Sequence, residues 1–516
     1  MKKFKSFYKI LLLSSVYFLS CTDLTDVAED AIVTNGPVDA GAGSPEAVLG
    51  DAYAQLNGFN AENNLFGLLE GSSDELVVPT RGTDWSDFGV WRQMQQHTWD
   101  PTHSFIFNAW QQLNTGTFRA ERAIQVAGSN VAILAPARFL RAFYTYYLVD
   151  LYGQVPYRTD LNDPDEVPSV YTRVEATDLI IEDLNYAIEN LPSFDPNNHG
   201  VASKEAAQFL LAKVYLNKPV FTAENPAGPY NFAVEDMQKV VSLADAVIAS
   251  GSFSLTDYWD NFGPNNGAES KEIVLGRINN PGAPISNVTN RIYNTLHYSQ
   301  GGWNGFSTLA DFYNKWNEPS VGGDVRKNSA VPGITDQNGI RGGFLEGQQY
   351  DKDGNELKDR SGNPLVFTVE LDLLYSNERN GVRVIKYLPP PNDPDTDFDE
   401  SQAPGNDFIL LRYADLLLMR AEALFRLGDE SALSQVNEIR TQRGANALTS
   451  LSEQALLDER GYEMYWEGWR RNDQIRFGVF LGEWTEKPAS PPTSVLYPIP
   501  QRAIDTNPNL IQNEGY

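Results

Sequence analysis

The chain has 516 residues, with 68 acidic against 40 basic side chains and a formal net charge of −28. This charge argues against a nucleic-acid-binding protein, because the phosphates would be repelled, and against dependence on an anionic lipid surface. The length is sufficient for several domains or for one large repeat-built unit. Ten tryptophans are many for so polar a chain and favour an aromatic binding face.

The first twenty residues have the layout of a secretory signal. Four lysines precede an apolar run over residues 10–19, which is too short to span a bilayer. Cys21 follows and is the one cysteine of the chain. The arrangement resembles a bacterial lipobox, so we expect residues 1–20 to be removed and Cys21 to be lipidated, which would take the net charge from −28 to −32. The alternative is a plain cleaved signal beside a chance cysteine.

Helical periodicity dominates the first half of the chain after a flexible polar tether over residues 21–43. Ser44 can cap a helix whose first turn contains Pro45. Residues 57–108 lose the period, and a long irregular segment of this kind is often functional. Further helices are predicted over residues 109–127, 136–151, 173–191, 204–216 and 234–249.

The second half divides into a loop-rich insertion over about 251–407 and a helical region over about 408–516. In the insertion, Asp351–Asn355 and Arg360–Pro364 are predicted as turns between short strands, and Val382–Tyr387 as a strand. Helices are predicted at 411–427, 431–443 and 452–469. The first two form a hairpin of tetratricopeptide-like length and pattern. The prediction is one mainly α domain over residues 44–516, with long irregular loops and a few short strands.

Several ordered motifs resemble the SusD/RagB family. Residues 410–423 read LLRYADLLLMRAEA, residues 497–500 read YPIP, and residues 507–516 read NPNLIQNEGY. Residues 458–473 contain the acidic and basic positions of a further family motif, and residues 138–156 match the N-terminal half. The charged positions Arg412, Asp415 and Glu422 on one helix, with Glu459, Arg460, Glu463 and Arg470 on another, are expected to form ion pairs between helices rather than a catalytic carboxylate pair.

The resemblance implies an outer-membrane lipoprotein that faces the cell exterior and binds oligosaccharide or polysaccharide. It implies a TonB-dependent (SusC-like) transporter as partner, to which the glycan is delivered. It also implies a helical scaffold with tetratricopeptide-like pairs and long loops that form the binding face.

Glycan binding needs a flat apolar face for C–H groups and planar polar groups for hydroxyls. Two unperiodic clusters offer both. Arg81, Asp84, Trp85 and Trp91 form the first, and Trp85 leads because the family often uses an aromatic from this region. Tyr298, Trp303 and Asn304 form the second. Asp74 and Arg383 are weaker candidates. Either Trp85 or Trp91 could instead fill a satellite core, and Trp110, Trp466 and Trp469 are expected in the core because they lie on helices.

The sequence indicates no catalytic residues. It contains no GxSxG, HExxH or phosphate loop, and its four histidines lack zinc spacing. We expect no enzyme activity, cofactor or metal. At Asp351–Glu356 we favour a plain hairpin turn over a calcium-binding loop, because the residues lack the spacing of an EF-hand. Two other functions stay open: a lipid-anchored capture or lid subunit for peptide or another non-carbohydrate nutrient, and a glycoside hydrolase, for which no carboxylate pair stands out.

Overall fold

The computed structural model describes residues 44–163, 165–279, 288–390 and 405–516. The predicted signal, Cys21 and the predicted tether over 21–43 lie outside the described residues. Within them the fold is mainly helical with short strands, which confirms the predicted fold class. In the part of the chain that the structure describes, no helix has the length and apolarity needed to cross a bilayer.

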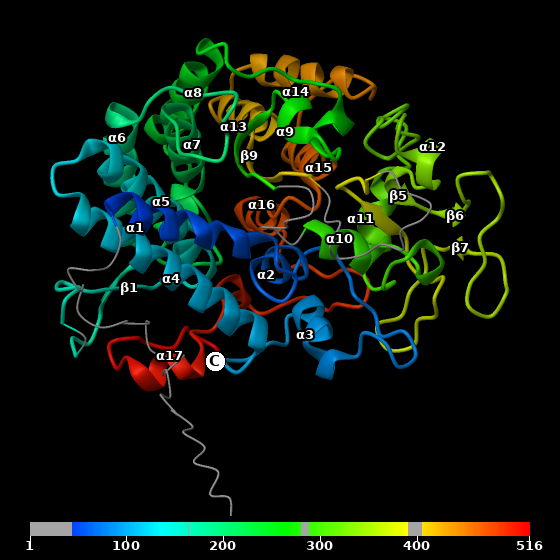
Figure 1. The fold of residues 1–516 in the computed structure, drawn as a ribbon, viewed down its shortest axis with the longest axis horizontal. Helices are drawn as coiled ribbons and strands as arrows, with labels where there is room; N and C mark the ends of the chain where they lie inside the picture. Colours follow the sequence, from blue (N-terminus) through cyan, green and yellow to red (C-terminus); the bar gives the residue numbers. More distant parts are fainter. Residues whose placement is uncertain (1–43, 164, 280–287, 391–404) are drawn as a thin grey trace, which may run out of the picture.

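Eight long helices build the scaffold, and consecutive helices pack on each other as in tetratricopeptide-like pairs. α4 packs on α5, α5 on α6, α6 on α7 and α7 on α8, and then α8 contacts α13 and α13 contacts α14. Figure 1 shows this helical scaffold on one side and the loop-rich region on the other. Their bounds are α4 Ser104–Ala127, α5 Val131–Leu151, α6 Arg173–Asn190, α7 Lys204–Phe221, α8 Val234–Ala249, α13 Tyr413–Arg426, α14 Ser431–Gln442 and α15 Glu453–Met464.

The predicted helices are all present, and their ends differ where the local signal was weak. Ser44 caps α1 (Pro45–Ala54), since its hydroxyl accepts from the Ala47 amide. α5 begins five residues before Pro136, because the Asn130 side chain caps it through the Ala132 amide at 3.2 Å. The helix predicted over 452–469 is wrong in its last five residues: α15 ends at Met464, and a separate α16 covers Arg470–Arg476.

The segment predicted as irregular, residues 57–108, contains short helices. They are η1 (Gln55–Asn60), α2 (Leu65–Glu70), η2 (Asp87–Gly89) and α3 (Val90–Gln96), and α4 already begins at Ser104. These helices are too short for a periodic signal, which needs a window of about 11 residues. The loop between them, residues 71–86, remains irregular apart from isolated bridges.

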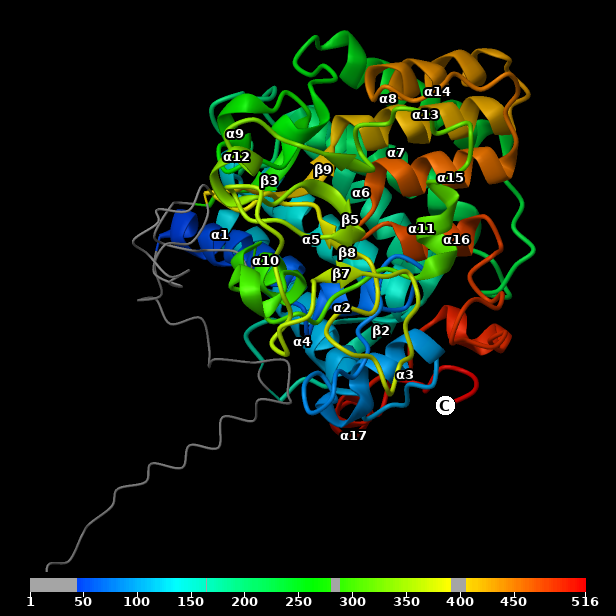
Figure 2. The same cartoon turned by 90° about the vertical axis from the view of Figure 1, so that its right-hand side faces the viewer.

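Short antiparallel strands tie the loop-rich region together (Figure 2). β3 (Ile273–Arg277) pairs with β9 (Phe408–Arg412), which leads directly into α13. β4 (Asn328–Ser329), β5 (Gly342–Leu345) and β8 (Arg383–Ile385) form a three-stranded sheet. The pairs β1–β2 (Val155–Tyr157, Ser169–Tyr171) and β6–β7 (Gly347–Gln348, Val366–Phe367) complete the named strands, and the remaining short helices are η3 Tyr258–Asn261, α9 Asn266–Glu269, α10 Val288–Thr295, η4 Tyr298–Gln300, α11 Ala310–Lys315, α12 Thr335–Asn338, η6 Pro492–Val495 and α17 Gln501–Thr506.

The predicted turn at Asp351–Asn355 is confirmed. The Asp351 carboxylate accepts the amides of Asp353 and Asn355, each at 2.9 Å, and the Gly354 amide bonds the Asp351 carbonyl at 3.1 Å. Asp359 closes the second turn in the same way through Ser361 and Asn363. Both carboxylates therefore cap their own turns.

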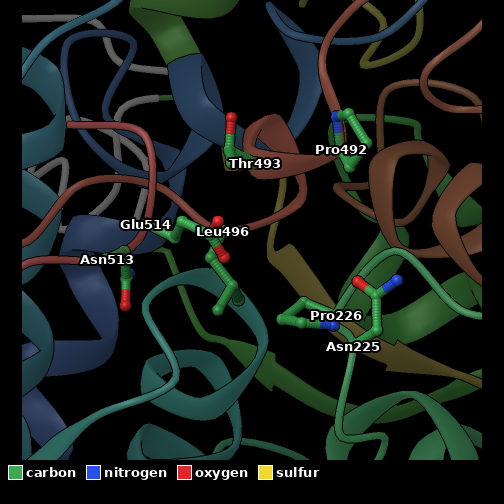
Figure 3. Close-up of a pocket in the computed structure, with 7 residues that line it drawn as sticks. All are labelled: Asn225, Pro226, Pro492, Thr493, Leu496, Asn513 and Glu514. Atoms are coloured by element: carbon green, nitrogen blue, oxygen red, sulfur yellow. The ribbon is translucent and has the colours of Figure 1, made fainter.

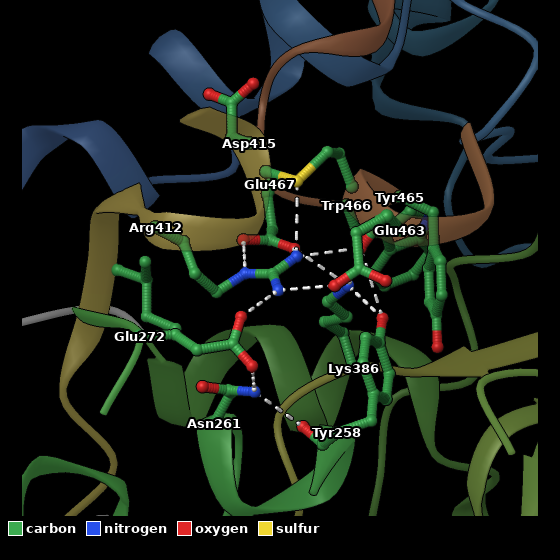
Figure 4. Close-up of polar contacts among 12 residues, drawn as sticks. Tyr258, Asn261, Glu272, Lys386, Arg412, Asp415, Glu463, Tyr465, Trp466 and Glu467 are labelled. Atoms are coloured by element: carbon green, nitrogen blue, oxygen red, sulfur yellow. Dashed lines mark hydrogen bonds and ion pairs between the residues drawn. The ribbon is translucent and has the colours of Figure 1, made fainter. Parts of the chain in front are cut away.

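The motif charges form a buried ion-pair network between elements (Figure 4). Arg412 contacts Glu463 at 2.6 Å, Glu467 at 2.7 Å and Glu272, the residue before β3, at 3.0 Å. Elsewhere, Arg460 pairs with Asp415 at 2.9 Å. The expected pairing is thus confirmed for Asp415 with Arg460 and for Arg412, which lies at the end of β9, with Glu463. Glu422 instead binds Arg476 of α16, and Arg470, also in α16, binds Asp74. Because buried charges need partners, these pairs fix α13, α15 and the start of β3 relative to one another. Trp110, Trp466 and Trp469 are buried, as predicted.

Candidate functional site

The two candidate clusters, more than 200 residues apart in the chain, meet at one place. The indole Nε1 of Trp85 donates to the Trp303 carbonyl at 2.8 Å, with a sequence separation of 218. The Tyr298 hydroxyl donates to Asp84 Oδ2 at 2.5 Å. We call this region, formed by residues 81–85, 298–304, 360 and 378, the loop site.

Two buried arginines hold the loops of this site in place. Arg81 donates to Ser307 Oγ at 2.8 Å and to the carbonyls of Asn377 and Asn380 at 2.6 and 2.8 Å. Arg383 also bonds Ser307 Oγ, at 2.9 Å, and its Nη2 bonds Asn304 Oδ1 at 2.7 Å. Burial lowers the pKa of Arg81 to about 9 and that of Arg383 well below its usual range. The Nη donors of both arginines bind protein oxygens and so orient the loops, whereas Arg81 Nε is buried without a partner among the described residues.

Trp85 lies half-buried across the second loop. Its ring packs on Phe306 with centroids 5.6 Å apart, and a Cβ added at Gly305 would lie 2.2 Å from the indole. Glycine at position 305 is therefore what allows the ring to approach. Trp85 (φ 61°) adopts a left-handed backbone conformation that bulky residues rarely take, and Asn304 (φ 57°) adopts the same conformation, which asparagine tolerates.

Trp303 is the open aromatic surface of the loop site. Its side chain is 40% exposed, and its other face stacks on Tyr293, with centroids 5.5 Å apart and an interplanar angle of 22°. Its amide bonds the Tyr293 carbonyl at 2.6 Å, which fixes the ring in position. A preorganised ring of this kind can receive the apolar face of a sugar at small entropic cost.

The structure separates the remaining candidates by burial. Trp91 is 5% exposed and packs edge-on against Phe105 and Phe306, so it fills the core, the alternative stated for it above. Asn304 and Arg81 are also buried and bind neighbouring loops. Asp74 is bound by Arg470 at 2.7 and 2.8 Å and is structural. Trp85, Asp84, Tyr298 and Trp303 retain accessible surface.

Sequence reasoning missed Arg360 and Glu378. The Arg360 guanidinium lies 3.8 Å from the centroid of the Tyr298 ring and bridges Glu378 and Asp84, the latter at 3.5 Å. Glu378 also faces His297 Nε2 at 3.1 Å, and burial lowers the pKa of His297 to about 4, so the imidazole is neutral at physiological pH. The partners are 18 to 276 residues apart, so no local motif signals them.

Two further aromatic side chains near these loops face solvent. Phe88 is fully exposed, three residues after Trp85, and Tyr375 is 83% exposed. Tyr375 precedes Ser376, whose backbone pairs with Arg81. Nothing in the periodicity distinguishes them from core aromatics, because Phe88 lies in the single turn η2 and Tyr375 in a loop, and neither segment is long enough for a periodic signal.

A separate pocket of about 470 Å³ lies at the C-terminal segment (Figure 3). Asn225, Pro226, Pro492, Thr493, Leu496, Asn513 and Glu514 line it. Its amides are engaged within the fold: Asn513 Nδ2 donates to the carbonyls of Tyr152 and Tyr497, and Asn225 Oδ1 accepts from the Ala227 amide. These bonds hold the C-terminal segment on the scaffold. Unlike the loop site, the pocket has no aromatic side chain among its lining residues.

Among the described residues, no group of three or more His, Cys, Asp or Glu side chains is arranged to hold a metal ion. The loop site instead combines accessible aromatic faces with carboxylate, hydroxyl and guanidinium groups at their edges. This combination on a rigid helical scaffold is typical of carbohydrate-binding proteins.

Comparison with known proteins agrees with this class. A model of the SusD family matches residues 271–516, and a family described as starch-binding and associating with the outer membrane matches residues 73–216. The chain belongs to the SusD family, which is associated with the outer membrane and whose members are binding proteins.

Relatives and solved structures extend over most of the chain. The starch-binding protein SusD of Bacteroides thetaiotaomicron is 27% identical over 419 residues, 74% of this chain and 72% of that protein. A SusD superfamily protein of Parabacteroides distasonis has a TM-score of 0.69 at 20% identity, over 92% of this chain and 98% of its own. A laminarin-binding SusD-like protein has a TM-score of 0.67 at 20% identity, over 92% of this chain and 99% of its own.

Proposed function

We propose that this chain is a surface-exposed lipoprotein that captures oligosaccharide or polysaccharide on the loop site and delivers it to a TonB-dependent outer-membrane transporter. The observation that carries the proposal is the meeting of Trp85 and Trp303, two accessible indoles from distant loops, beside Asp84 and Tyr298. The names of two relatives, starch-binding and laminarin-binding, agree with a glycan ligand. Lipid on Cys21 would keep the site at the membrane.

The proposal is tested by affinity electrophoresis of the protein starting at Thr22, through gels that contain a panel of polysaccharides. Retardation by at least one glycan is expected. If no polysaccharide retards the protein, a glycan-capture role fails, and a peptide or other nutrient takes its place. Release of soluble product from a retarding glycan would instead indicate a hydrolase. Mass spectrometry of the N-terminal peptide of the native protein tests lipidation of Cys21.

A further inference from the structure

Four arginines surround the loop site, and they decide which glycans it can accept. Arg81 and Arg383 lie beneath it, and Arg360 and Arg379 lie at its edge. An anionic sugar, such as a uronate or a sulfated unit, needs a solvent-facing cation whose donors are free to bind a carboxylate or sulfate.

The two inner arginines offer nothing to a ligand. Arg81 and Arg383 are 3% and 0% exposed, and their donors bond the loop carbonyls and Ser307 described above. Burial lowers the pKa of both guanidinium groups, because the protein interior disfavours their charge. Their role is to position the loops.

The two outer arginines are exposed but committed to carboxylates. Arg360 is 55% exposed on its side chain and binds Glu378 through Nε and Asp84 through Nη2, while its backbone amide bonds Glu378 Oε2 at 3.1 Å. Arg379 pairs with Asp359 at 3.5 Å. Three carboxylates thus face two arginines at the rim. Exposed Lys358 lies between Glu356 and Asp359 in the chain.

From this arrangement we infer that the loop site selects uncharged glycans, and that Asp84 and Glu378 are the residues that exclude anionic ones by occupying Arg360. This inference rests on the proposed function of the same site. Its chemistry is direct: an anionic sugar at Trp303 would meet two carboxylates and would have to displace one of them from Arg360. The net charge of −28 adds a longer-range repulsion of polyanions.

The test is affinity electrophoresis of the protein from Thr22 onward with matched neutral and anionic gels, for example a neutral glucan panel against a polyuronate and a sulfated galactan, at low and high salt. Binding of a neutral glycan is expected to be independent of salt, with anionic glycans bound at least about tenfold more weakly. Equal or stronger retardation by an anionic glycan would overturn the inference and leave glycan capture intact. Retardation by no glycan would overturn the proposed function and this inference with it.

A gain of function gives the second arm. In the double variant Asp84→Asn with Glu378→Gln, which keeps the shape of both side chains, the positive charge of Arg360 is no longer neutralised by these two carboxylates, and retardation by the anionic glycan is expected to rise about tenfold. Adding Arg360→Gln is expected to remove that gain. A double variant that keeps the wild-type melting temperature but gains no anionic binding contradicts the inference. If the double variant does not fold, the wild-type panel decides alone.

Discussion

Glu70 and Glu75 are a buried carboxyl pair beside the scaffold core. Glu70 Oε1 accepts the Gly468 amide at 2.5 Å, and Glu75 Oε2 accepts the Trp466 amide at 3.1 Å. The Arg470 guanidinium lies 3.7 Å from Glu75 and is bound to Asp74 at 2.7 Å. Burial raises the pKa of Glu70 to about 7 and that of Glu75 well above its usual range. The folded protein therefore keeps a proton here that the unfolded chain loses near pH 4.5.

This pair predicts a loss of stability toward alkaline pH. The stabilisation from the Glu70 proton is complete below pH 4.5 and is lost as pH rises through about 7, at most about 3 kcal/mol. In Glu70→Gln, which keeps an acceptor for Gly468, the melting temperature is expected to fall less between pH 5 and pH 8 than in the wild type. Glu235→Gln, at an exposed position, serves as control. Parallel melting curves for wild type and Glu70→Gln would contradict the assignment.

The geometry of the loop site depends on the close approach of the Trp85 ring to Gly305 in the second loop. The backbone of Gly305 lies outside the left-handed region, so alanine is compatible with the chain there, yet its Cβ would lie 2.2 Å from the indole. Gly305→Ala is therefore expected to displace the Trp85 ring and to weaken glycan binding about tenfold or more, with a modest loss of stability, because the ring is partly buried.

The measurement for Gly305→Ala is glycan affinity together with the melting temperature. Gly50→Ala in α1 is the matched control, since no atom lies within 4 Å of the added Cβ. Wild-type affinity in Gly305→Ala would show that the position of the Trp85 ring does not matter for binding.

The helical elements were largely predictable, and the loop site was predictable only in part. α6 matches its predicted range because its capping box, Thr172 with Glu175, is local in sequence. α8 also matches its predicted range, although it has no side-chain cap among the described residues. Trp85 and Trp91 share one unperiodic segment, and only α3, which begins at Val90, turns Trp91 into the core. The contact of Arg360 with Asp84 joins two loops that are far apart in the chain, and no local sequence pattern predicts it.

The whole molecule is held by the buried ion network that links its helical and loop-rich halves. Glu463 is its hub, contacting Arg412 at 2.6 Å, Arg443 at 2.8 Å and Arg326 at 2.9 Å. Burial disfavours its charge, but these three arginines hold the pKa of Glu463 well below its usual range. The network therefore joins α15 to β9, to the end of α14 and to the loop before β4.

Removing the charge of this hub is expected to destabilise the whole fold. Glu463→Gln leaves three buried guanidinium groups undercompensated, which costs about 3–5 kcal/mol of unfolding free energy. Asp353→Asn removes the exposed pair with Lys352, at 3.2 Å, and is expected to change stability by at most about 1 kcal/mol. Thermal unfolding of both variants compares them, and equal melting temperatures would show that the network contributes little to stability.

The central claim is that glycan is held on the aromatic surface of Trp85 and Trp303. The most direct test is isothermal titration of the wild type, Trp303→Ala and Tyr350→Ala with a glycan that retards the wild type. Tyr350 is the control, an exposed aromatic on a hairpin outside the loop site. We predict that Trp303→Ala lowers affinity at least about tenfold at an unchanged melting temperature, while Tyr350→Ala binds as the wild type does. Wild-type affinity in Trp303→Ala would contradict the claim.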